Sequence, residues 1–276
     1  MKKRILISIL LIPFLAFVTY VPSLHHALFS LFLMVLCVLA SREIHALSGR
    51  VVSFRNKRTS YLWFMLPSLL LITAGFTIPF VHRDPGAILY LCIGMVPVLW
   101  MGSCVAYGIR RGIRLATLFM IGFMYCGVFP LLLLLLRRGE QGFLFICFLF
   151  LVAWMDDAAA YFVGTYFGKT RGIVKYSPNK SLEGYIGAFI VTMIVANAFK
   201  LILGDGFIPD LLQTNVLAVC IAVFAPLGDL GESVFKRKTG VKDSSHLLPG
   251  LGGVLDVFDS ILVSVPVYYI LVKIMI

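Results

Sequence analysis

The chain has 276 residues, of which 60% are hydrophobic and only 13% are charged. That is more apolar side chain than a soluble core of this size can bury, so the surplus must face lipid. The composition therefore excludes a water-soluble domain. The formal net charge of +11 has its ordinary cause in the basic cytoplasmic loops of membrane proteins, and it does not indicate nucleic-acid binding.

Apolar runs follow one another along the whole chain. A helix needs about 20 apolar residues to cross roughly 30 Å of hydrocarbon. Nine runs approach or reach this length, at residues 5–20, 27–47, 61–81, 87–109, 115–136, 142–164, 186–203, 215–228 and 257–276. Because lipid offers no partner to backbone polar groups and the runs do not alternate, helices are favoured over a barrel. We therefore predict an all-α, polytopic transmembrane bundle of about nine helices.

The division of the chain follows the distribution of its polar residues. Residues 1–141 are expected to form N-terminal transmembrane helices. Residues 142–276 are expected to form a C-terminal transmembrane region that carries the catalytic groups, within one continuous membrane domain. The basic start at residues 1–4 precedes an apolar run without a convincing cleavage site, so we expect a retained first helix.

The basic residues predict an orientation. With the amino terminus in the cytoplasm, most of the 24 Lys and Arg residues fall in the inner segments between the predicted spans. This bias predicts an inner-membrane protein with a basic cytoplasmic face, which attracts anionic lipid head groups and nucleotides. Arg137 and Arg138 fall on the opposite side and are the main exceptions. We expect a polar cleft in the C-terminal half that faces the cytoplasm.

Acidic residues gather in the second half of the chain. Most of the acids lie between residues 156 and 259, and five of them lie within or at the margins of apolar spans: Asp156, Asp157, Asp229, Asp256 and Asp259. An unpaired carboxylate in a membrane costs several kcal/mol, and it usually marks a site or a pathway.

Two segments present acids at helical spacing. Residues at i, i+3, i+4 and i+7 share one helix face, and four polar side chains follow this spacing: Asp229, Glu232, Ser233 and Lys236. Asp256 and Asp259 are likewise three residues apart. Two such helices can hold a divalent cation with the oxygen ligands that Mg²⁺ prefers. The alternative is that the acids form ion pairs that satisfy helix ends, with Lys236, Arg237 or Lys242.

Two loops offer anion sites. Residues 236–253 combine basic side chains with a glycine-rich end, which is typical of a phosphate cradle, although a tight turn explains the glycines equally well. In residues 177–184, Ser181 stands at a predicted helix start, where backbone amides favour anions. An ordinary capped helix is the alternative there. Upstream, Asp157 and Tyr161 share a helix face that should look toward the protein interior.

These residues together resemble a known family. The run Ser233-x-x-Lys236-Arg237-x-x-x-x-Lys242-Asp243-Ser244-x-x-x-Leu248-Pro249-Gly250-x-Gly252-Gly253-x-x-Asp256-x-x-Asp259 closely resembles the motif of phosphatidate cytidylyltransferases, or CDP-diacylglycerol synthases. Two upstream runs resemble that family's other motifs in the same order: Asp157-x-x-Ala160-Tyr161-x-x-Gly164 and Ser177-Pro178-x-Lys180-Ser181-x-Glu183-Gly184. The first half matches only by hydropathy and by Arg42-Glu43.

The resemblance implies a nucleotidyltransferase of phospholipid biosynthesis. In that family the phosphate of phosphatidate attacks the α-phosphorus of CTP, giving CDP-diacylglycerol and pyrophosphate, with Mg²⁺ required and room for a second, monovalent cation such as K⁺. The metal ligands would be Asp229 and Asp256, with Asp259 in support. The other implied catalytic residues are Ser233 and Lys236. The implied substrate-binding residues are Asp157, Lys180, Ser181, Glu183, Arg237, Lys242, Asp243, Gly252 and Gly253. A homodimer is plausible for such a bundle.

Two positions depart from the family pattern. Leu251 stands where the family has histidine, and Val257 stands where it has arginine, so two phosphate-binding donors are missing. The alternatives are therefore a related CTP-dependent enzyme that acts on a polyprenol or another lipid phosphate, and an ion-coupled transporter. A transporter predicts broken helices in both halves, whereas the acids here lie almost wholly in the second half.

Overall fold

The computed structural model describes residues 15, 17–20, 23–54, 56–77, 86–174, 176–248 and 250–275. In this part of the chain the regular structure is entirely helical, apart from isolated bridges between Arg171 and Ser181 and between Leu248 and Gly252. The chain divides into two compact units. The N-terminal unit comprises Met1–Leu135 and Lys238–Asp256, and the C-terminal unit comprises Leu136–Arg237 and Val257–Ile276.

Six helices among the described residues are long and apolar enough to cross a membrane: Ala27–Val51, Ile109–Arg138, Gly142–Tyr166, Leu182–Gly206, Leu211–Lys238 and Leu255–Met275. They confirm six of the expected spans as apolar helices. Helices also cover most of the runs expected at 61–81 and 87–109. Most of the run expected at 5–20 lies outside the described residues. The total of nine spans stays a prediction, as does the boundary at 141/142.

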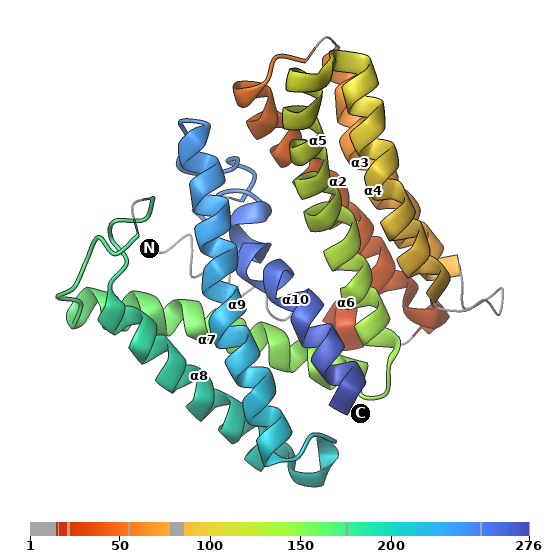
Figure 1. Ribbon diagram of the computed structural model, residues 1–276. Helices are drawn as coiled ribbons and strands as arrows, with labels where there is room; N and C mark the ends of the chain where they lie inside the picture. Colours follow the sequence, from red (N-terminus) through yellow and green to blue (C-terminus); the bar gives the residue numbers. More distant parts are fainter. Residues whose placement is uncertain are drawn as a thin grey trace. The chain divides into compact units, whose positions relative to one another are not determined.

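The N-terminal unit is built from successive helices (Figure 1): α2 (Ser23–Val51), α3 (Lys57–Thr77), α4 (Gly86–Tyr107), α5 (Ile109–Phe123), the π-helical turn η2 (Met124–Val128) and the start of α6 (Phe129–Arg138). α2, α3 and α5 all pack on η2. Phe64 and Phe119 form an edge-to-face pair with centroids 4.6 Å apart in its core. Gly108, at φ 77°, makes the sharp turn between α4 and α5, where a β-carbon would be strained.

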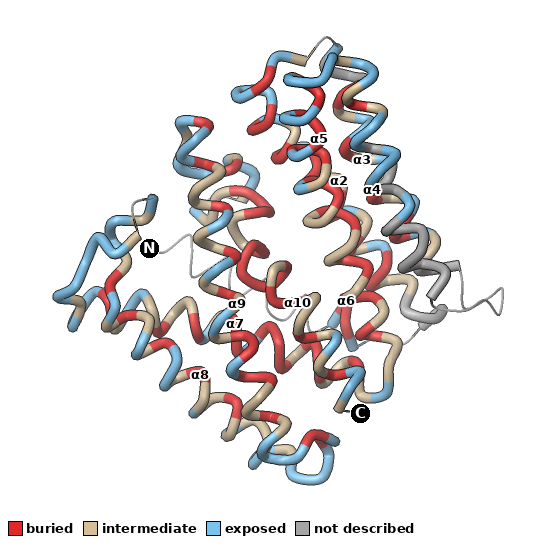
Figure 2. Tube along the Cα trace, in the orientation of Figure 1, coloured by how far each residue is buried: buried red, intermediate tan, exposed pale blue. Residues whose placement is uncertain are grey.

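The C-terminal unit contains α7 (Gly142–Tyr166), α8 (Leu182–Leu203), most of α9 (Leu211–Lys238) and most of α10 (Leu255–Met275). α7 and α8 lie side by side (Figure 1), and Gly164 and Gly184 face each other at their crossing. Small residues there let two backbones approach closely. α10 packs on α7 in the buried region shown in red in Figure 2, where the Tyr268 hydroxyl donates to the Phe145 carbonyl at 3.0 Å.

The segment between α9 and α10, residues 239–254, is named the connector below. It belongs to the N-terminal unit, together with Leu255 and Asp256 at the start of α10. A segment late in the sequence is therefore packed with the first helices of the chain. Hydropathy alone does not predict this assignment, because the connector is polar and glycine-rich.

Gly228 is required where α9 meets α10. A β-carbon there would clash with the backbone carbonyl oxygen of Asp259 and lie 3.0 Å from the Cα of Ser260. Because neither backbone can yield without moving a helix, we expect Gly228→Ala to cost about 1–3 kcal/mol. The thermal unfolding midpoint in detergent should fall by roughly 3–10 °C. The control is Gly206→Ala, since a β-carbon at Gly206 meets nothing within 4 Å. Equal midpoints for the two variants would contradict the close approach.

Candidate functional site

Four carboxylates come together in the C-terminal unit. Asp157 comes from α7, Asp229 and Glu232 from α9, and Asp259 from α10. Asp259 lies within electrostatic reach of the other three, and Glu232 is near enough to share a hydrogen bond with it. Glu232 and Asp259 are each only 5% exposed. The helical spacing therefore brings together the acids of three helices, as the sequence predicts for two of them.

Two lysines compensate part of this negative charge. Lys180, in the loop before α8, forms an ion pair with Asp229. Lys236 donates to Glu232 at 2.6 Å, one helical turn away on α9. Burial by itself would lower the pKa of Lys180, but the Asp229 carboxylate opposes this and the pKa is raised overall. Lys180 is therefore a cation at neutral pH.

The alternative interpretation of the acids as ion-pair partners is thus correct for Glu232 and Lys236. The sequence did not predict the partner of Asp229, because Lys180 is far away along the chain. Arg237 and Lys242 are exposed, and neither belongs to the two ion pairs found among the described residues.

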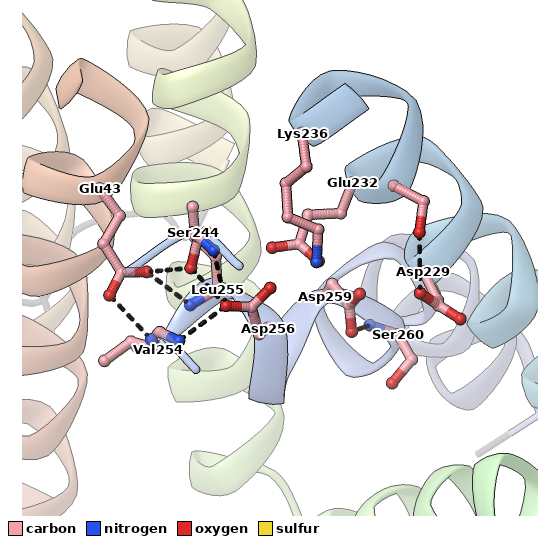
Figure 3. A network of polar contacts seen from close by, with 12 residues as sticks. Glu43, Asp229, Glu232, Lys236, Ser244, Val254, Leu255, Asp256, Asp259 and Ser260 are labelled. Carbon is pink, nitrogen blue, oxygen red and sulfur yellow. Dashed lines mark hydrogen bonds and ion pairs between the residues drawn. The ribbon is translucent and has the colours of Figure 1, made fainter. Parts of the chain in front are cut away.

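Serines complete the polar face of this cluster, which is named the acidic cluster below. The Ser260 hydroxyl donates to Asp157 at 3.0 Å, and its backbone N–H donates to Asp259 at 2.6 Å. The Ser233 hydroxyl is 3.4 Å from Asp229 (Figure 3). The neighbouring Asp156 is not part of this face, since it is buried and accepts a hydrogen bond from Thr192.

Asp256 lies in the N-terminal unit and is bound into the connector. Its Oδ2 atom accepts hydrogen bonds from the Ser244 N–H at 2.8 Å, the Ser244 hydroxyl at 2.7 Å and the Gly253 N–H at 2.7 Å. Gly252 has φ 96°, and a β-carbon there would lie 2.5 Å from the same oxygen. The glycines of the connector therefore let its backbone wrap around a carboxylate, as Figure 3 shows.

Glu43 of α2 is a member of the same network that the sequence did not single out as a site residue. Its two oxygens accept four hydrogen bonds, from Ser244, Ser245, Val254 and Leu255. A signal was present, because Glu43 is the only acid inside the spans expected for residues 1–141. An acid at such a position is by default a functional candidate.

The loop before α8 is stabilised by two of the predicted binding residues. Ser181 is the N-cap of α8, where its hydroxyl accepts from the Gly184 N–H at 3.2 Å. Glu183 accepts from the Thr170 N–H at 3.1 Å and from the Thr170 hydroxyl at 2.9 Å. These contacts agree with the alternative interpretation as a capped helix. Substrate binding by Ser181 and Glu183 stays a prediction.

The predicted metal ligands are distributed over both units. Asp229 and Asp259 belong to the C-terminal unit, and Asp256 belongs to the N-terminal unit, three residues before Asp259 on α10. Within the described residues, no group of three or more His, Cys, Asp or Glu side chains forms a ready-made metal site. Metal binding by these residues stays a prediction.

Comparison with known proteins matches residues 2–275 to the cytidylyltransferase family. A phosphatidate cytidylyltransferase of Haemophilus influenzae is 43% identical over 133 residues, or 46% of this chain and 45% of that protein. One of Thermotoga maritima is 43% identical over 130 residues, or 44% and 46%. One of Brucella melitensis is 32% identical over 281 residues, or 98% and 92%. The matched region thus spans about half of the first two relatives and nearly all of the third.

The acidic cluster should weaken the fold when no cation is bound. Like charges at close range repel each other in a medium of low dielectric constant. We therefore expect Asp259→Asn to raise the thermal midpoint in EDTA, by roughly 2–5 °C, and to reduce the further rise on adding Mg²⁺. The control is Asp205→Asn, because Asp205 is exposed in the turn after α8. A lower midpoint for Asp259→Asn in EDTA, with Mg²⁺ stabilisation intact, would contradict a cation role.

Proposed function

This chain belongs to the cytidylyltransferase family, and we propose that it transfers the cytidylyl group of CTP to phosphatidate, giving CDP-diacylglycerol and pyrophosphate. The observation that carries the proposal is the acidic cluster with its two lysines, set on helices long and apolar enough to cross a membrane. Relatives named phosphatidate cytidylyltransferase match through this region, and one matches nearly the whole chain.

The reaction asks mainly for positioning and charge neutralisation. A phosphate oxygen of phosphatidate forms a bond to the α-phosphorus of CTP, and the bond to the β-phosphate oxygen breaks, so pyrophosphate leaves with the electron pair. Both substrates are anions, and negative charge builds up on the leaving group. Fixed cations and dipoles aimed at these oxygens lower the barrier without covalent chemistry by the protein.

The lysines of the acidic cluster are suited to hold phosphate groups. Lys180 and Lys236 each carry a positive charge beside a carboxylate, with side chains 24% and 11% exposed. A triphosphate that approached would offer these ammonium groups a second, stronger acceptor. The proposal assigns further phosphate contacts to Ser233, Arg237 and Lys242. Five residues complete the binding pocket together with Lys180: Asp157, Ser181, Glu183, Asp243 and the Gly252–Gly253 pair.

The donor set of the acidic cluster fits Mg²⁺. The available ligands are carboxylate oxygens, and Mg²⁺ commonly binds one or two carboxylates together with substrate phosphates and water. A ready-made cage of three acids is therefore not required. Asp229 and Asp259 are the ligands proposed from the C-terminal unit, and Asp256 is kept on the resemblance alone. Bound with CTP, Mg²⁺ would neutralise phosphate charge, and a monovalent cation such as K⁺ would serve as a second centre.

The proposal includes the setting of the site. We place it in a cleft open to the cytoplasm, within an inner-membrane bundle of nine helices, on the positive-inside bias of the basic residues. CTP would then reach the site from the cytoplasm and phosphatidate from the bilayer. Assembly as a homodimer is a further prediction.

A second acceptor lipid is kept as an alternative. Leu251 and Val257 replace a histidine and an arginine of the family pattern, and both lie beside Asp256 in the sequence. A changed donor set near the reacting phosphate would favour another lipid phosphate or a polyprenol as acceptor. Comparison of phosphatidate with a polyprenyl phosphate and a polyprenol in one assay separates these possibilities.

The first test of the function is turnover by the purified protein. With CTP, Mg²⁺ and phosphatidate in detergent, we expect CDP-diacylglycerol and equimolar pyrophosphate. Asp229→Ala and Asp256→Ala should lower kcat at least about 100-fold, because each removes charge that neutralises or positions the phosphates. Membrane insertion of both variants should remain intact.

Asp205→Asn again serves as the control and should retain wild-type turnover. Full activity of either alanine variant would refute its metal assignment. Turnover with a polyprenyl phosphate or a polyprenol but not with phosphatidate would replace the proposed acceptor.

Leu251 tests how the connector accommodates its departure from the family. It lies in the tight turn in which the Leu248 carbonyl accepts the N–H groups of Leu251 and Gly252, both at 3.0 Å. Because histidine would restore a phosphate donor without changing this backbone, we expect Leu251→His to give equal or higher kcat/KM for CTP. Leu251→Ala controls for loss of the side chain. A clear loss with histidine but not with alanine would show that the turn is packed for leucine.

A further inference from the structure

Glu43 is a buried acid in a helix that is apolar enough to cross a membrane. It lies within the Ala27–Val51 span on α2 and is only 5% exposed. Such a carboxylate costs several kcal/mol unless its charge is compensated. Among the described residues Glu43 belongs to neither of the two ion pairs. Its compensation must therefore come from neutral donors.

Four such donors are present, and all belong to the connector and the start of α10. The Ser245 hydroxyl donates to Oε1 at 2.6 Å and the Val254 N–H at 2.9 Å. The Ser244 hydroxyl is 3.0 Å from Oε2, and the Leu255 N–H donates to the same oxygen at 2.9 Å. Two of the donors are backbone amides at the N-terminus of α10, where the helix dipole also favours a negative charge.

The connector is shaped to the Glu43 carboxylate. A β-carbon on Gly253 would lie 2.5 Å from Oε2 and 2.6 Å from Oε1 of Glu43. The backbone can therefore come this close only with glycine at that position. Glu43 thus has in this loop a fitted partner, more than 200 residues further along the chain.

Ser244 links Glu43 to Asp256. Its hydroxyl lies 3.0 Å from Oε2 of Glu43 and 2.7 Å from Oδ2 of Asp256. A hydroxyl carries one proton, so it donates to only one of these acceptors at a time. Ser244 is therefore positioned by both acids, and its backbone N–H also donates to Asp256. Moving or neutralising Glu43 changes the surroundings of Asp256 through this one side chain.

We infer that Glu43 is a positioning residue that anchors the connector and the N-terminus of α10, and thereby orients Asp256 for the nucleotide and its cation. The consequence for catalysis rests on the proposed function, whereas the anchoring does not. Glu43 is not assigned a contact with substrate. Its effect should reach the reaction only through the connector, and it should concern CTP and Mg²⁺ and not the lipid.

The test compares Glu43→Gln with Glu140→Gln in the full-length protein in detergent. Glutamine keeps the size of the side chain but loses the charge and one acceptor oxygen, whereas Glu140 is exposed in the turn before α7. Hydrogen–deuterium exchange without substrate measures the anchoring. For Glu43→Gln we expect peptides covering 244–255 to exchange at least about tenfold faster, since hydrogen bonds to a charged group are weakened. Peptides covering 169–183 should exchange as in the wild type.

Kinetics measure the consequence. For Glu43→Gln we expect the KM for CTP and the Mg²⁺ concentration for half-maximal activity to rise at least about fivefold. The KM for phosphatidate should stay within about twofold. A merely structural role would reduce the amount of active enzyme and leave both KM values alike. Glu140→Gln should leave all these quantities unchanged.

A milder variant covers the case in which Glu43→Gln does not fold. Ser245→Ala removes a single donor from Oε1, and it should change the exchange and kinetics in the same direction but by less. Where both fold, the double variant should show less than the sum of the single effects on a free-energy scale, because the two residues act through one contact.

Unchanged exchange of 244–255 in both variants would overturn the anchoring. Equal changes in the KM values for CTP and phosphatidate would overturn the positioning role. A wild-type protein without cytidylyltransferase activity would defeat the proposed function, and the exchange experiment would then still decide the anchoring.

Discussion

Carboxylates placed inside apolar helices impose the main constraint on this molecule. Each needs a compensating partner, because lipid and an apolar core provide none. In the C-terminal unit the partners are lysines, with Lys180 on Asp229 and Lys236 on Glu232. In the N-terminal unit the partners of Glu43 are hydroxyl and backbone N–H groups. The two solutions have different chemical consequences.

A lysine can exchange its partner, whereas a backbone amide in a folded loop cannot. Lysine is a compact cation on a flexible stem, so it can turn from a carboxylate to a phosphate when an anion arrives. The acidic cluster is therefore suited to change its contacts during a reaction. The connector around Glu43 and Asp256 is suited to stay as it is, since its donors are fixed by the backbone and by a glycine that no other residue can replace.

The sequence predicts the parts of the molecule that follow local rules. Six apolar runs are helices because hydropathy and length decide that outcome, and Glu232 and Lys236 meet because they are one turn apart. It does not predict the pair of Lys180 with Asp229 or the contacts of Glu43, since these depend on how distant segments pack. Spacing along one helix says nothing about which loop will lie against it.

α10 joins the two kinds of compensation. Its first turn carries Asp256, which is bound into the connector, and Asp259, which belongs to the acidic cluster. The two are three residues apart on one helix, so their directions are coupled by the helix geometry. Glu43 holds the backbone amide of Leu255, immediately before Asp256. An acid near the start of the chain is thus tied to the register of the helix that presents both aspartates, which gives the N-terminal helices a role beyond crossing the membrane.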